Sequence, residues 1–350
     1  MKKIRVLMLG PDRSVHGGVS AMVNNLYEAG LDQKVELYYI GTMIDGSKVR
    51  KLLCAVYAYL KFLCVIKGYD IIHINMASDA SYYRKKIFVD TAYLFHKKIV
   101  IHEHGGNFVS FYNRMNLKQQ QNVKKTLNKA SAFIVLSREW KKFFSDIVTV
   151  VPIQIMHNAV PVPDEGRRDY SDHNVLFLGR ICTDKGMTEL LAAADRLDKK
   201  IPDMHLYLGG IYEDLYWKKE VEKRSRYITC VGWITGADKE KMLKDVCSVF
   251  VLPSYYEGQP VSLMEAMSYG LASIASDIGG ITEVMGSNEG VLIPVKDSNA
   301  LTNALKNLVT DTGKKNALGT AARNRIIADY DISRMVENLV GLYANIGELI

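Results

Sequence analysis

Short apolar runs alternate with helical patterns along most of the chain. The runs are apolar at nearly every position, as in strands that are buried on both faces of a parallel sheet. The segments between them place apolar residues three and four positions apart, which is typical of helices with one buried face. Strands are predicted at 4–10, 35–40, 70–75, 98–106 and 132–137, and again at 174–180, 205–210, 227–232 and 248–253. Two successive strand–helix series predict an α/β protein with two Rossmann-like domains.

The most apolar long segment, 52–66, lies inside a predicted helix over 48–67. Lys61 interrupts this segment, and the segment is too short to span a bilayer. We interpret it as a buried helix, with contact between one of its sides and lipid as the alternative. The apolar run at 6–9 is also too short for the core of a signal peptide.

The length of 350 residues is sufficient for two domains, which we place at 1–163 and 174–330 with a polar linker between them. A further helix is predicted over 331–350. Hydrophobic residues make up 48% and charged residues 24% of the chain, which indicates a globular protein. The five Cys include no C-x2-C pair, which argues against a disulfide framework or a zinc site and favours a reducing compartment.

The net charge of +7 is uneven, because residues 1–165 carry 23 Lys or Arg and 13 Asp or Glu, whereas residues 166–350 carry 22 and 25. A basic first half suggests an anionic partner, such as a membrane surface or a lipid diphosphate. A basic surface that merely keeps the protein soluble is the alternative. Nucleic acid is not expected, because no basic motif is interleaved with aromatic residues.

The stretch 254–270, S-Y-Y-E-G-Q-P-V-S-L-M-E-A-M-S-Y-G, follows a predicted strand and reads as a tight loop and a helix. Glu257 lies in the loop and Glu265 on the helix. Gly258 allows close approach of the backbone to a ligand, and Pro260 suits the first turn of a helix. The start of a helix attracts phosphate, whereas two carboxylates suit sugar hydroxyls. An ordinary surface helix with two solvated Glu is the alternative.

Other polar residues are predicted at the carboxyl ends of strands, where open parallel sheets bind ligands. We expect His73, Asn75 and His104 to face one crevice of the first domain. In the second domain, Arg180 and Lys185 follow a strand and could hold a diphosphate, although two solvated surface charges would fit the same pattern. Gly209 would allow a nucleotide to approach, and Trp233 is expected near its base. The loop at 11–19 lacks G-x-G-x-x-G, so an NAD site is not supported.

The motif E-G-x-P-x-S-L-x-E-A-M resembles the donor-site signature of retaining glycosyltransferases of family 4, which have the GT-B fold. Within that family it is most like bacterial enzymes that build capsule, exopolysaccharide or O-antigen chains. The resemblance covers nearly the whole chain, is strongest from 175 to 283 and is weak from 12 to 168. It implies two Rossmann-like domains that face each other across a cleft, with the terminal helix packed back on the first. It also implies metal-independent catalysis without a cofactor.

The resemblance assigns roles to individual residues. Arg180 and Lys185 match the family's G-R-x4-K-G and would stabilise the leaving diphosphate, Glu265 would bind the ribose and Glu257 the sugar. His104 matches a strand-end H-G that contacts the transferred sugar, so the catalytic set is Arg180, Lys185, Glu257 and His104. The His157–Pro161 segment departs from the family's P-N-G-V, which weakens any role for Asn158. The remaining predicted donor-binding residues are Gly17, Gly18, Gly209, Trp233, Gly258, Gln259, Pro260, Val261 and Glu265, and the predicted acceptor-side residues are His16, His73 and Asn75.

The predicted activity is retaining transfer of a hexose or hexosamine from a nucleotide-diphosphate sugar, with UDP favoured over GDP, to a glycan or a lipid-linked acceptor. Two alternatives are a nucleotide-sugar epimerase of similar fold and a non-catalytic nucleotide-sugar-binding subunit. We expect the protein in the cytoplasm, peripheral at the inner face of the cell membrane. Its predicted membrane contact is a cluster of basic and aromatic residues, Tyr82, Tyr83, Arg84, Lys85 and Lys86.

Overall fold

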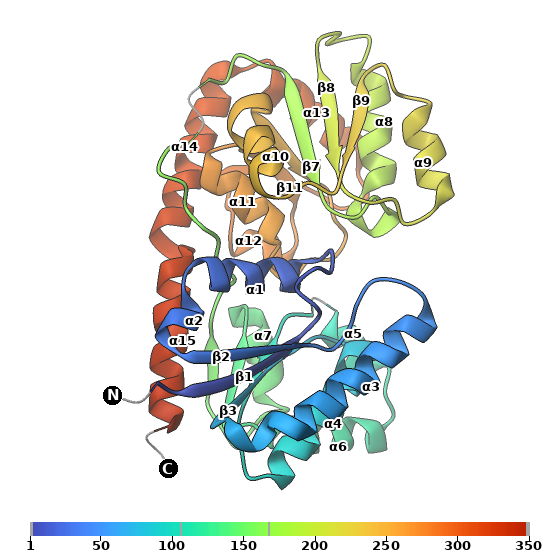
Figure 1. The fold of residues 1–350 in the computed structure, drawn as a ribbon. Coiled ribbons are helices and arrows are strands. Elements are labelled where there is room, and N and C mark those ends of the chain that lie inside the picture. The colour runs from blue at the N-terminus through green and yellow to red at the C-terminus, as the bar shows by residue number, and fades with distance from the viewer. Residues whose placement is uncertain (1–2, 106, 167–168, 348–350) are drawn as a thin grey trace. The chain divides into compact units, whose positions relative to one another are not determined.

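The computed structural model describes residues 3–105, 107–166 and 169–347. The described chain divides into two compact units, of which unit 1 comprises Met1–Ala159 with Ile332–Ile350, and unit 2 comprises Val160–Asp331. Four parts of the predictions lie outside the described residues: the first two residues of the basic amino terminus, position 106 after the fourth strand, positions 167–168 in the linker, and positions 348–350 of the terminal helix. The predicted α/β class with two Rossmann-like domains is confirmed, because each unit is built on a parallel sheet of six strands (Figure 1).

Unit 1 has the strand order β2-β1-β3-β4-β5-β6. Its strands are β1 (Arg5–Gly10), β2 (Glu36–Gly41), β3 (Ile71–Met76), β4 (Lys98–Glu103), β5 (Ala132–Val135) and β6 (Ile153–Ile155). Its α-helices are α1 (Gly18–Glu28), α2 (Leu31–Lys34), α3 (Lys48–Val65), α4 (Ala80–Leu94), α5 (Phe108–Asn113), α6 (Leu117–Leu127), α7 (Arg138–Ser145) and α15 (Ile332–Gly347). Helix α15 packs on α1 and α2, so the end of the chain belongs to this unit.

Side chains alternate between the two faces of the unit 1 sheet. Leu7, Leu9, Ile72 and Ile74 join one apolar core with Phe62 of α3. On the neighbouring position of β3, His73 contacts α15 instead, through a hydrogen bond of 2.6 Å between its Nδ1 and the hydroxyl of Tyr343. The two faces of this sheet therefore differ, one being an apolar core and the other carrying buried polar side chains.

Unit 2 has the strand order β12-β11-β10-β7-β8-β9. Its strands are β7 (Asn174–Leu178), β8 (His205–Gly209), β9 (Ile228–Gly232), β10 (Val249–Leu252), β11 (Ala272–Ser276) and β12 (Gly290–Ile293). Its α-helices are α8 (Met187–Leu197), α9 (Leu215–Glu222), α10 (Gly236–Lys241), α11 (Val261–Tyr269), α12 (Gly279–Thr282), α13 (Ser298–Val309) and α14 (Thr312–Asp329). Short helical turns complete the two units at η1 (Ile66–Gly68), η2 (Thr183–Lys185) and η3 (Met242–Val246).

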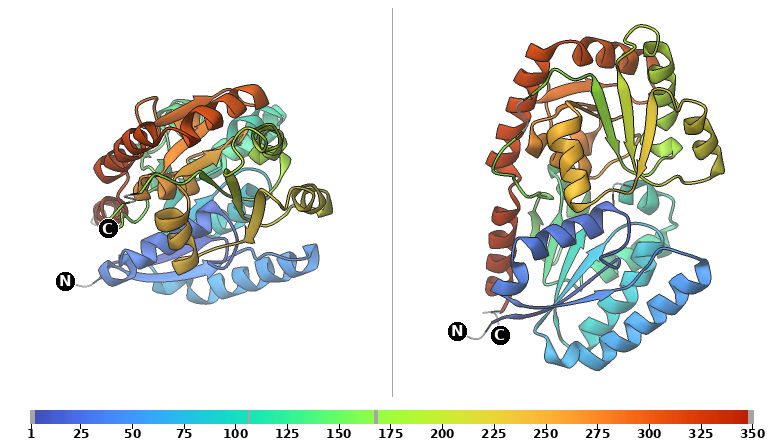
Figure 2. Two further views of the ribbon diagram at one scale, coloured as in Figure 1. Left: turned by 90° about the horizontal axis from the view of Figure 1, so that it is seen from above. Right: turned by 45° about the horizontal axis from the view of Figure 1, so that its top comes forward.

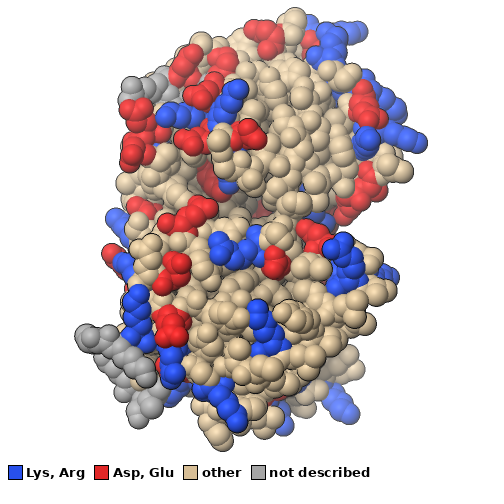
Figure 3. Space-filling view, viewed as in Figure 1, with Lys and Arg blue, Asp and Glu red and all other residues tan. Residues whose placement is uncertain are grey.

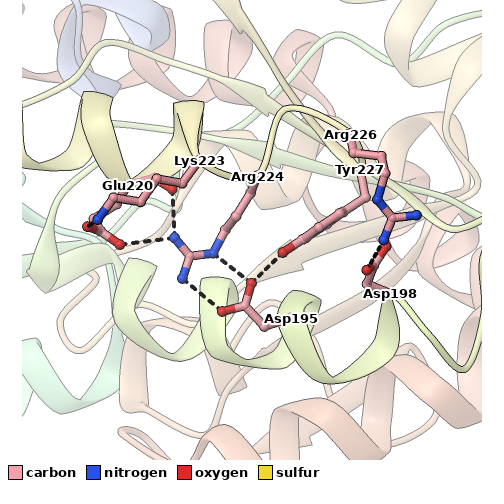
Figure 4. A network of polar contacts seen from close by, with 7 residues as sticks. All are labelled: Asp195, Asp198, Glu220, Lys223, Arg224, Arg226 and Tyr227. Carbon is pink, nitrogen blue, oxygen red and sulfur yellow. Dashed lines mark hydrogen bonds and ion pairs between the residues drawn. The ribbon is translucent and has the colours of Figure 1, made fainter.

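A network of polar contacts joins α8 to α9 and to the turn before β9 (Figure 4). Arg224 binds both carboxylate oxygens of Asp195, at 2.6 and 2.8 Å, and one oxygen of Glu220 at 3.0 Å. The hydroxyl of Tyr227 donates to the same Asp195 carboxylate. Asp195 lies near the end of α8 and Tyr227 directly precedes β9, so the network is at the amino ends of the strands. Ligands bind at the opposite ends, and we therefore interpret the network as structural.

Two predictions about α3 and α4 are wrong. Helix α3 is not buried, since much of its apolar side chain surface faces solvent, with Leu52, Leu53 and Tyr57 each about two-thirds exposed. Figures 1 and 2 show α3 and α4 side by side on the outside of unit 1. In α4 the predicted membrane cluster is divided, because Lys85 and Tyr82 are buried. Lys85 donates a hydrogen bond to the hydroxyl of Thr42, and its burial holds the pKa of its amine well below the ordinary value.

Candidate functional site

In unit 2 the direction of strand succession reverses between β7 and β10, where the first strand of the unit lies beside the fourth. Open parallel sheets bind ligands at the carboxyl ends of the strands that flank such a reversal. The loop after β7 carries Arg180 and Lys185, and the loop after β10 carries Glu257 and Gly258. The topology therefore brings together two motifs that lie about 75 residues apart in the sequence.

Lys185 and Glu257 connect these two loops directly. The Lys185 amine lies 2.5 Å from the Glu257 carboxylate, and the two side chains are 23% and 11% exposed. The backbone N–H of Tyr255 donates to the carbonyl of Asp184 at 2.8 Å, which fastens the same loops. Gly186, between Lys185 and α8, has a φ of +72°, and a Cβ there would lie 2.1 Å from the Pro253 carbonyl oxygen. The loops thus approach each other too closely for any other residue at position 186.

Arg180 is more accessible than Lys185. Its guanidinium makes an exposed ion pair of 3.4 Å with Glu213, and about half of each side chain is exposed. Lys185, by contrast, is covered by Glu257. A diphosphate at this loop would meet one cation in an exposed ion pair with Glu213 and one that is already neutralised by Glu257.

Glu265 lies on α11 and also has a cationic partner. Its carboxylate is 2.6 Å from the amine of Lys239 in α10, and the Glu265 side chain is 12% exposed. Helix α11 starts after Pro260, which supplies no side-chain cap, so the first N–H groups of the helix are available to an anion. Gln259, Pro260 and Val261 are all buried at this helix start.

Two of the glycines near the site have close neighbours. A Cβ at Gly280 of α12 would lie 1.7 Å from the Gly258 carbonyl oxygen and 2.5 Å from that of Glu257, so α12 supports the Glu257 loop. A Cβ at Gly209 would lie 2.4 Å from a side-chain carbon of Leu178 in the neighbouring strand β7. A larger residue at position 209 would therefore require the Leu178 side chain to shift. Trp233 directly follows β9 and is half-buried.

Three residues near the site were not among the sequence predictions. Ser254 follows β10 and Ser276 is the last residue of β11. Each has a buried hydroxyl without a hydrogen-bond partner among the described residues. Lys239 was missed as the partner of Glu265. Position at a strand end is a signal that could have identified the two Ser, whereas the approach of Lys239 depends on how α10 packs.

In unit 1 the reversal lies between β1 and β3, and the loop after β1 carries His16, Gly17 and Gly18. His16 lies next to Asp45, with 3.6 Å between its Nδ1 and the carboxylate. A Cβ at Gly17 or Gly18 would meet no atom within 4 Å, and neither glycine has a φ in the left-handed region. Packing therefore does not require glycine at either position, which is consistent with space for a ligand.

Three histidines of unit 1, His73, His102 and His104, form a row on one face of the sheet. The rings of His73 and His102 are 5.5 Å apart and those of His102 and His104 are 4.0 Å apart, measured between centroids. Asn75 holds the end of the row, since its amide oxygen is 2.9 Å from the Nε2 of His104. His73 and Asn75 are buried, so the prediction that they face a crevice directly is wrong. Only His104 in this row is partly exposed.

Desolvation sets the protonation of this row. It lowers the pKa of His73 and of His104 to about 3, and it holds the pKa of His102 well below the ordinary value. Burial also raises the pKa of Glu103 well above the ordinary value, although the N–H of Gly105 donates to one of its oxygens. Neutral imidazoles can orient hydroxyl groups but carry no charge at neutral pH. The histidine row of unit 1 thus offers uncharged polar groups, whereas the loops after β7 and β10 of unit 2 offer charges.

Two absences concern the described residues alone. No group of three His, Cys, Asp or Glu side chains among residues 3–105, 107–166 and 169–347 is arranged to hold a metal ion. Within the same ranges, every helix is too short or too polar to cross a bilayer. What the described sites can do chemically is bind an anion and hydroxyl groups in unit 2 and orient uncharged polar groups in unit 1.

Comparison with known proteins agrees with the chemistry of unit 2. Residues 164–325 match the family model "Glycosyl transferases group 1". The "Alpha-maltose-1-phosphate synthase" of Mycolicibacterium smegmatis is 30% identical over 212 residues, or 55% of this chain and 54% of that protein. The Escherichia coli "UDP-Gal:alpha-D-GlcNAc-diphosphoundecaprenol alpha-1,3-galactosyltransferase" is 31% identical over 175 residues, or 48% of this chain and 44% of that protein. The chain spans about half the length of these curated relatives.

Solved structures resemble the chain over nearly its full length. The sucrose-phosphate synthase of Thermosynechococcus elongatus superposes with a TM-score of 0.81 at 20% identity, covering 99% of this chain and 100% of that one. Anabaena Alr3699/HepE, solved in complex with UDP-glucose, superposes with a TM-score of 0.74 at 15% identity, covering 97% and 99%. At these identities the likeness shows the fold, which is the GT-B fold with two Rossmann-like domains.

Proposed function

We propose that the protein is a retaining glycosyltransferase that transfers a hexose or hexosamine from a UDP-sugar to a glycan or lipid-linked acceptor in cell-surface polysaccharide biosynthesis. The observation that carries this proposal is the meeting of the Arg180–Lys185 loop with the Glu257 loop where strand order reverses in unit 2. The glycosyltransferase group 1 match of residues 164–325 and the UDP-glucose-bound structural neighbour support it.

The cations and the carboxylates of the site would bind different parts of the donor. Arg180, Lys185 and the start of α11 would bind the diphosphate and stabilise the charge that develops as it leaves. Glu265 would accept hydrogen bonds from the ribose hydroxyls, and Glu257 from the sugar hydroxyls. The departing phosphate oxygen would take the acceptor proton on the same face, which requires no protein base, metal or cofactor.

The ion pairs of this site fit such a ligand. Lys185 with Glu257 and Lys239 with Glu265 are half-buried pairs whose partners neutralise each other in the absence of a donor. A diphosphate would supply a second anion to Lys185, and sugar or ribose hydroxyls would supply donors to the carboxylates. Each charge in the site would therefore have a partner both with and without the donor, which avoids the cost of an unpaired buried charge.

In this proposal, unit 1 binds the acceptor and contacts the membrane. His104, oriented by Asn75, would contact the transferred sugar, and the glycine loop at 17–18 would leave room for the donor phosphates and the acceptor. The excess of Lys and Arg in residues 1–165 supports peripheral association with an anionic membrane in the cytoplasm. Lys85 and Tyr82 cannot take part in it, because both are buried.

A thermal-shift panel of UDP, GDP and their sugars tests the donor assignment. A ligand at 100 times its dissociation constant stabilises the folded state by roughly 2.7 kcal/mol, which is readily measured. We expect UDP and UDP-sugars to raise the melting temperature and GDP not to. An epimerase would interconvert UDP-sugars without an acceptor, and a binding subunit would show the shift without turnover on any acceptor.

A further inference from the structure

A pocket of about 790 Å³ lies within unit 1, between the loop after β1, the edge strand β2 and helix α3. Tyr39 of β2 and Tyr27 of α1 line it, and α3 forms one wall from Arg50 to Lys61. The eleven helical rises from Arg50 to Lys61 extend about 16 Å, so the pocket is an elongated trough. It reaches the carboxyl ends of β1 and β2, which is the ligand-binding edge of a parallel sheet.

The trough has an excess of positive charge. Arg13, Arg50 and Lys61 line it, against the single acid Asp12. Asp12 is engaged locally, because its carboxylate accepts hydrogen bonds of 3.0 and 2.7 Å from the backbone N–H and the hydroxyl of Ser14. Arg13 is held in place by Asn24 at 2.8 Å. Arg50 is exposed and has no carboxylate partner in the described part of the chain. These charges favour an anionic ligand at the Arg50 end.

One wall of the trough continues onto the exposed side of α3. Leu53 and Tyr57 line the trough although they are 64% and 66% exposed. They belong to a row of exposed apolar side chains at helical spacing, which we call the α3 apolar row: Val49, Leu52, Leu53, Val56, Tyr57, Leu60 and Leu63. Figure 3 shows a broad surface without Asp or Glu where α3 runs in unit 1. Contiguous exposed apolar surface of this kind marks a binding site.

The charges around the α3 apolar row have one sign. Between Asp45 and Asp70 the chain contains five Lys or Arg and no Asp or Glu. On the other flank of α3, Leu52, Val56 and Leu60 form a groove of about 270 Å³ with Ile87 of α4. An apolar helix face bordered by cations is complementary to an amphiphile that has an anionic head and a hydrocarbon chain.

We propose that the trough binds the phosphate head of an amphiphile, and that its hydrocarbon chain lies on the α3 apolar row. The phosphate would lie between Arg50 and Arg13, and the first part of the chain would contact Leu53 and Tyr57. This inference rests on the proposed function, because the amphiphile would be the lipid that carries the acceptor. Tyrosines and cations would also suit a soluble acidic glycan, but a glycan has no apolar part to cover the row beyond the trough.

Titration calorimetry with alkyl phosphates below their micelle concentration tests the proposal. Decyl phosphate should bind more tightly than octyl phosphate, by roughly threefold to fifteenfold for two added methylenes. Inorganic phosphate and octanol should bind much more weakly than either, because each supplies only half of the ligand. Equal affinity for octyl phosphate, decyl phosphate and inorganic phosphate would overturn the proposal. Binding of tetragalacturonate without binding of decyl phosphate would also overturn it.

Two variants locate the site. Arg50→Gln should lower the affinity for decyl phosphate by roughly tenfold, because a charge-assisted contact is lost. Leu53→Asn should bring the ratio of the affinities for decyl phosphate and octyl phosphate towards one. Lys118→Gln and Leu117→Asn on α6 are matched controls, since they make comparable changes at exposed positions away from the trough. Wild-type affinity in Arg50→Gln would place any binding elsewhere and contradict the proposal.

A parallel titration with UDP-glucose separates this inference from the proposed function. Arg50→Gln and Leu53→Asn should bind UDP-glucose as the wild type does, because neither residue belongs to unit 2. If the wild type binds UDP-glucose but no alkyl phosphate, the trough assignment fails and the donor assignment stands. If it binds alkyl phosphate but no uridine nucleotide, the donor assignment fails instead.

Discussion

Units 1 and 2 each place polar side chains at the carboxyl ends of six parallel strands, yet they treat charge in opposite ways. In unit 2 the polar groups are ions in opposed pairs, such as Lys185 with Glu257. In unit 1 the corresponding groups are imidazoles, and desolvation keeps His73 and His104 neutral at neutral pH. One topology therefore supports a charged site and an uncharged site, and the difference lies in whether each ionisable side chain has a partner of opposite charge.

The reason is energetic. A half-buried ion is tolerated when its counter-ion is adjacent, whereas an imidazole without one loses its proton as it is buried. A charged site suits a ligand that is itself charged, such as a nucleotide diphosphate. An uncharged site suits hydroxyl groups, which need orientation more than neutralisation. This contrast matches a donor in unit 2 and a sugar acceptor in unit 1.

The largest effect is expected from Lys185→Ala in unit 2. Loss of one preorganised cation should lower the transfer rate roughly 100- to 1000-fold. It also leaves the Glu257 carboxylate without its partner, so the melting temperature should fall. Lys218→Ala is the matched control, because its pair with Glu222 is 3.8 Å long and exposed. A transfer rate close to the wild type in Lys185→Ala, measured by UDP release, would remove the charged site from catalysis.

The two carboxylates should differ in their effect on UDP. Glu265→Gln should lower the affinity for UDP roughly tenfold or more in a calorimetric titration, because charge-assisted bonds to the ribose are lost. Glu257→Gln should leave the affinity for free UDP nearly unchanged, since its expected ligand is the sugar. Lys239→Gln controls for the broken ion pair with Glu265. Equal loss of UDP affinity in Glu257→Gln and Glu265→Gln would contradict the division of roles.

Glycine substitutions should separate packing from ligand space. Gly280→Ala in unit 2 should cost roughly 1–3 kcal/mol of unfolding free energy, because its Cβ would overlap the Gly258 carbonyl oxygen. Gly18→Ala in unit 1 should change stability by less than about 1 kcal/mol, since a Cβ there meets open space. Chemical denaturation measures both. If Gly18→Ala also transfers sugar at the wild-type rate, the space at this loop is not used by a ligand.

A further effect is expected from pH, through the uncharged site. The folded pKa of His73 is about 3 and lies below its unfolded value near 6.5, so the unfolded state binds the proton first as the pH falls. Unfolding free energy should therefore decrease by up to about 1.4 kcal/mol per pH unit for this residue between pH 6.5 and 3. Denaturation of His73→Gln at pH 7 and pH 5 should show a shallower decrease than the wild type. An unchanged slope would mean that His73 does not titrate in this range.

Local patterns in the sequence were enough to predict much of this protein. The strand series predicted β1–β5 and β7–β10, because a buried parallel strand is apolar at nearly every position, but β6, β11 and β12 were not predicted. The stretch around Glu257 and Glu265 was equally informative, since a strand end, a tight loop and a helix start interact over a few residues. In α4 the information was present but misread: Tyr82, Lys85 and Phe88 share one helical face, and that spacing indicates burial of Lys85.

Other properties were decided only when distant segments came together. The exposure of α3 depends on what covers it, and its apolar periodicity is the same whether another element packs there or not. The burial of His73 depends on strand parity and on Tyr343, which lies 270 residues away in the sequence. The pairing of Lys185 with Glu257 requires β7 and β10 to be neighbours, although two strands separate them along the chain. Propensity and periodicity act over one or two turns, whereas burial, pKa and ion pairing depend on neighbours in space.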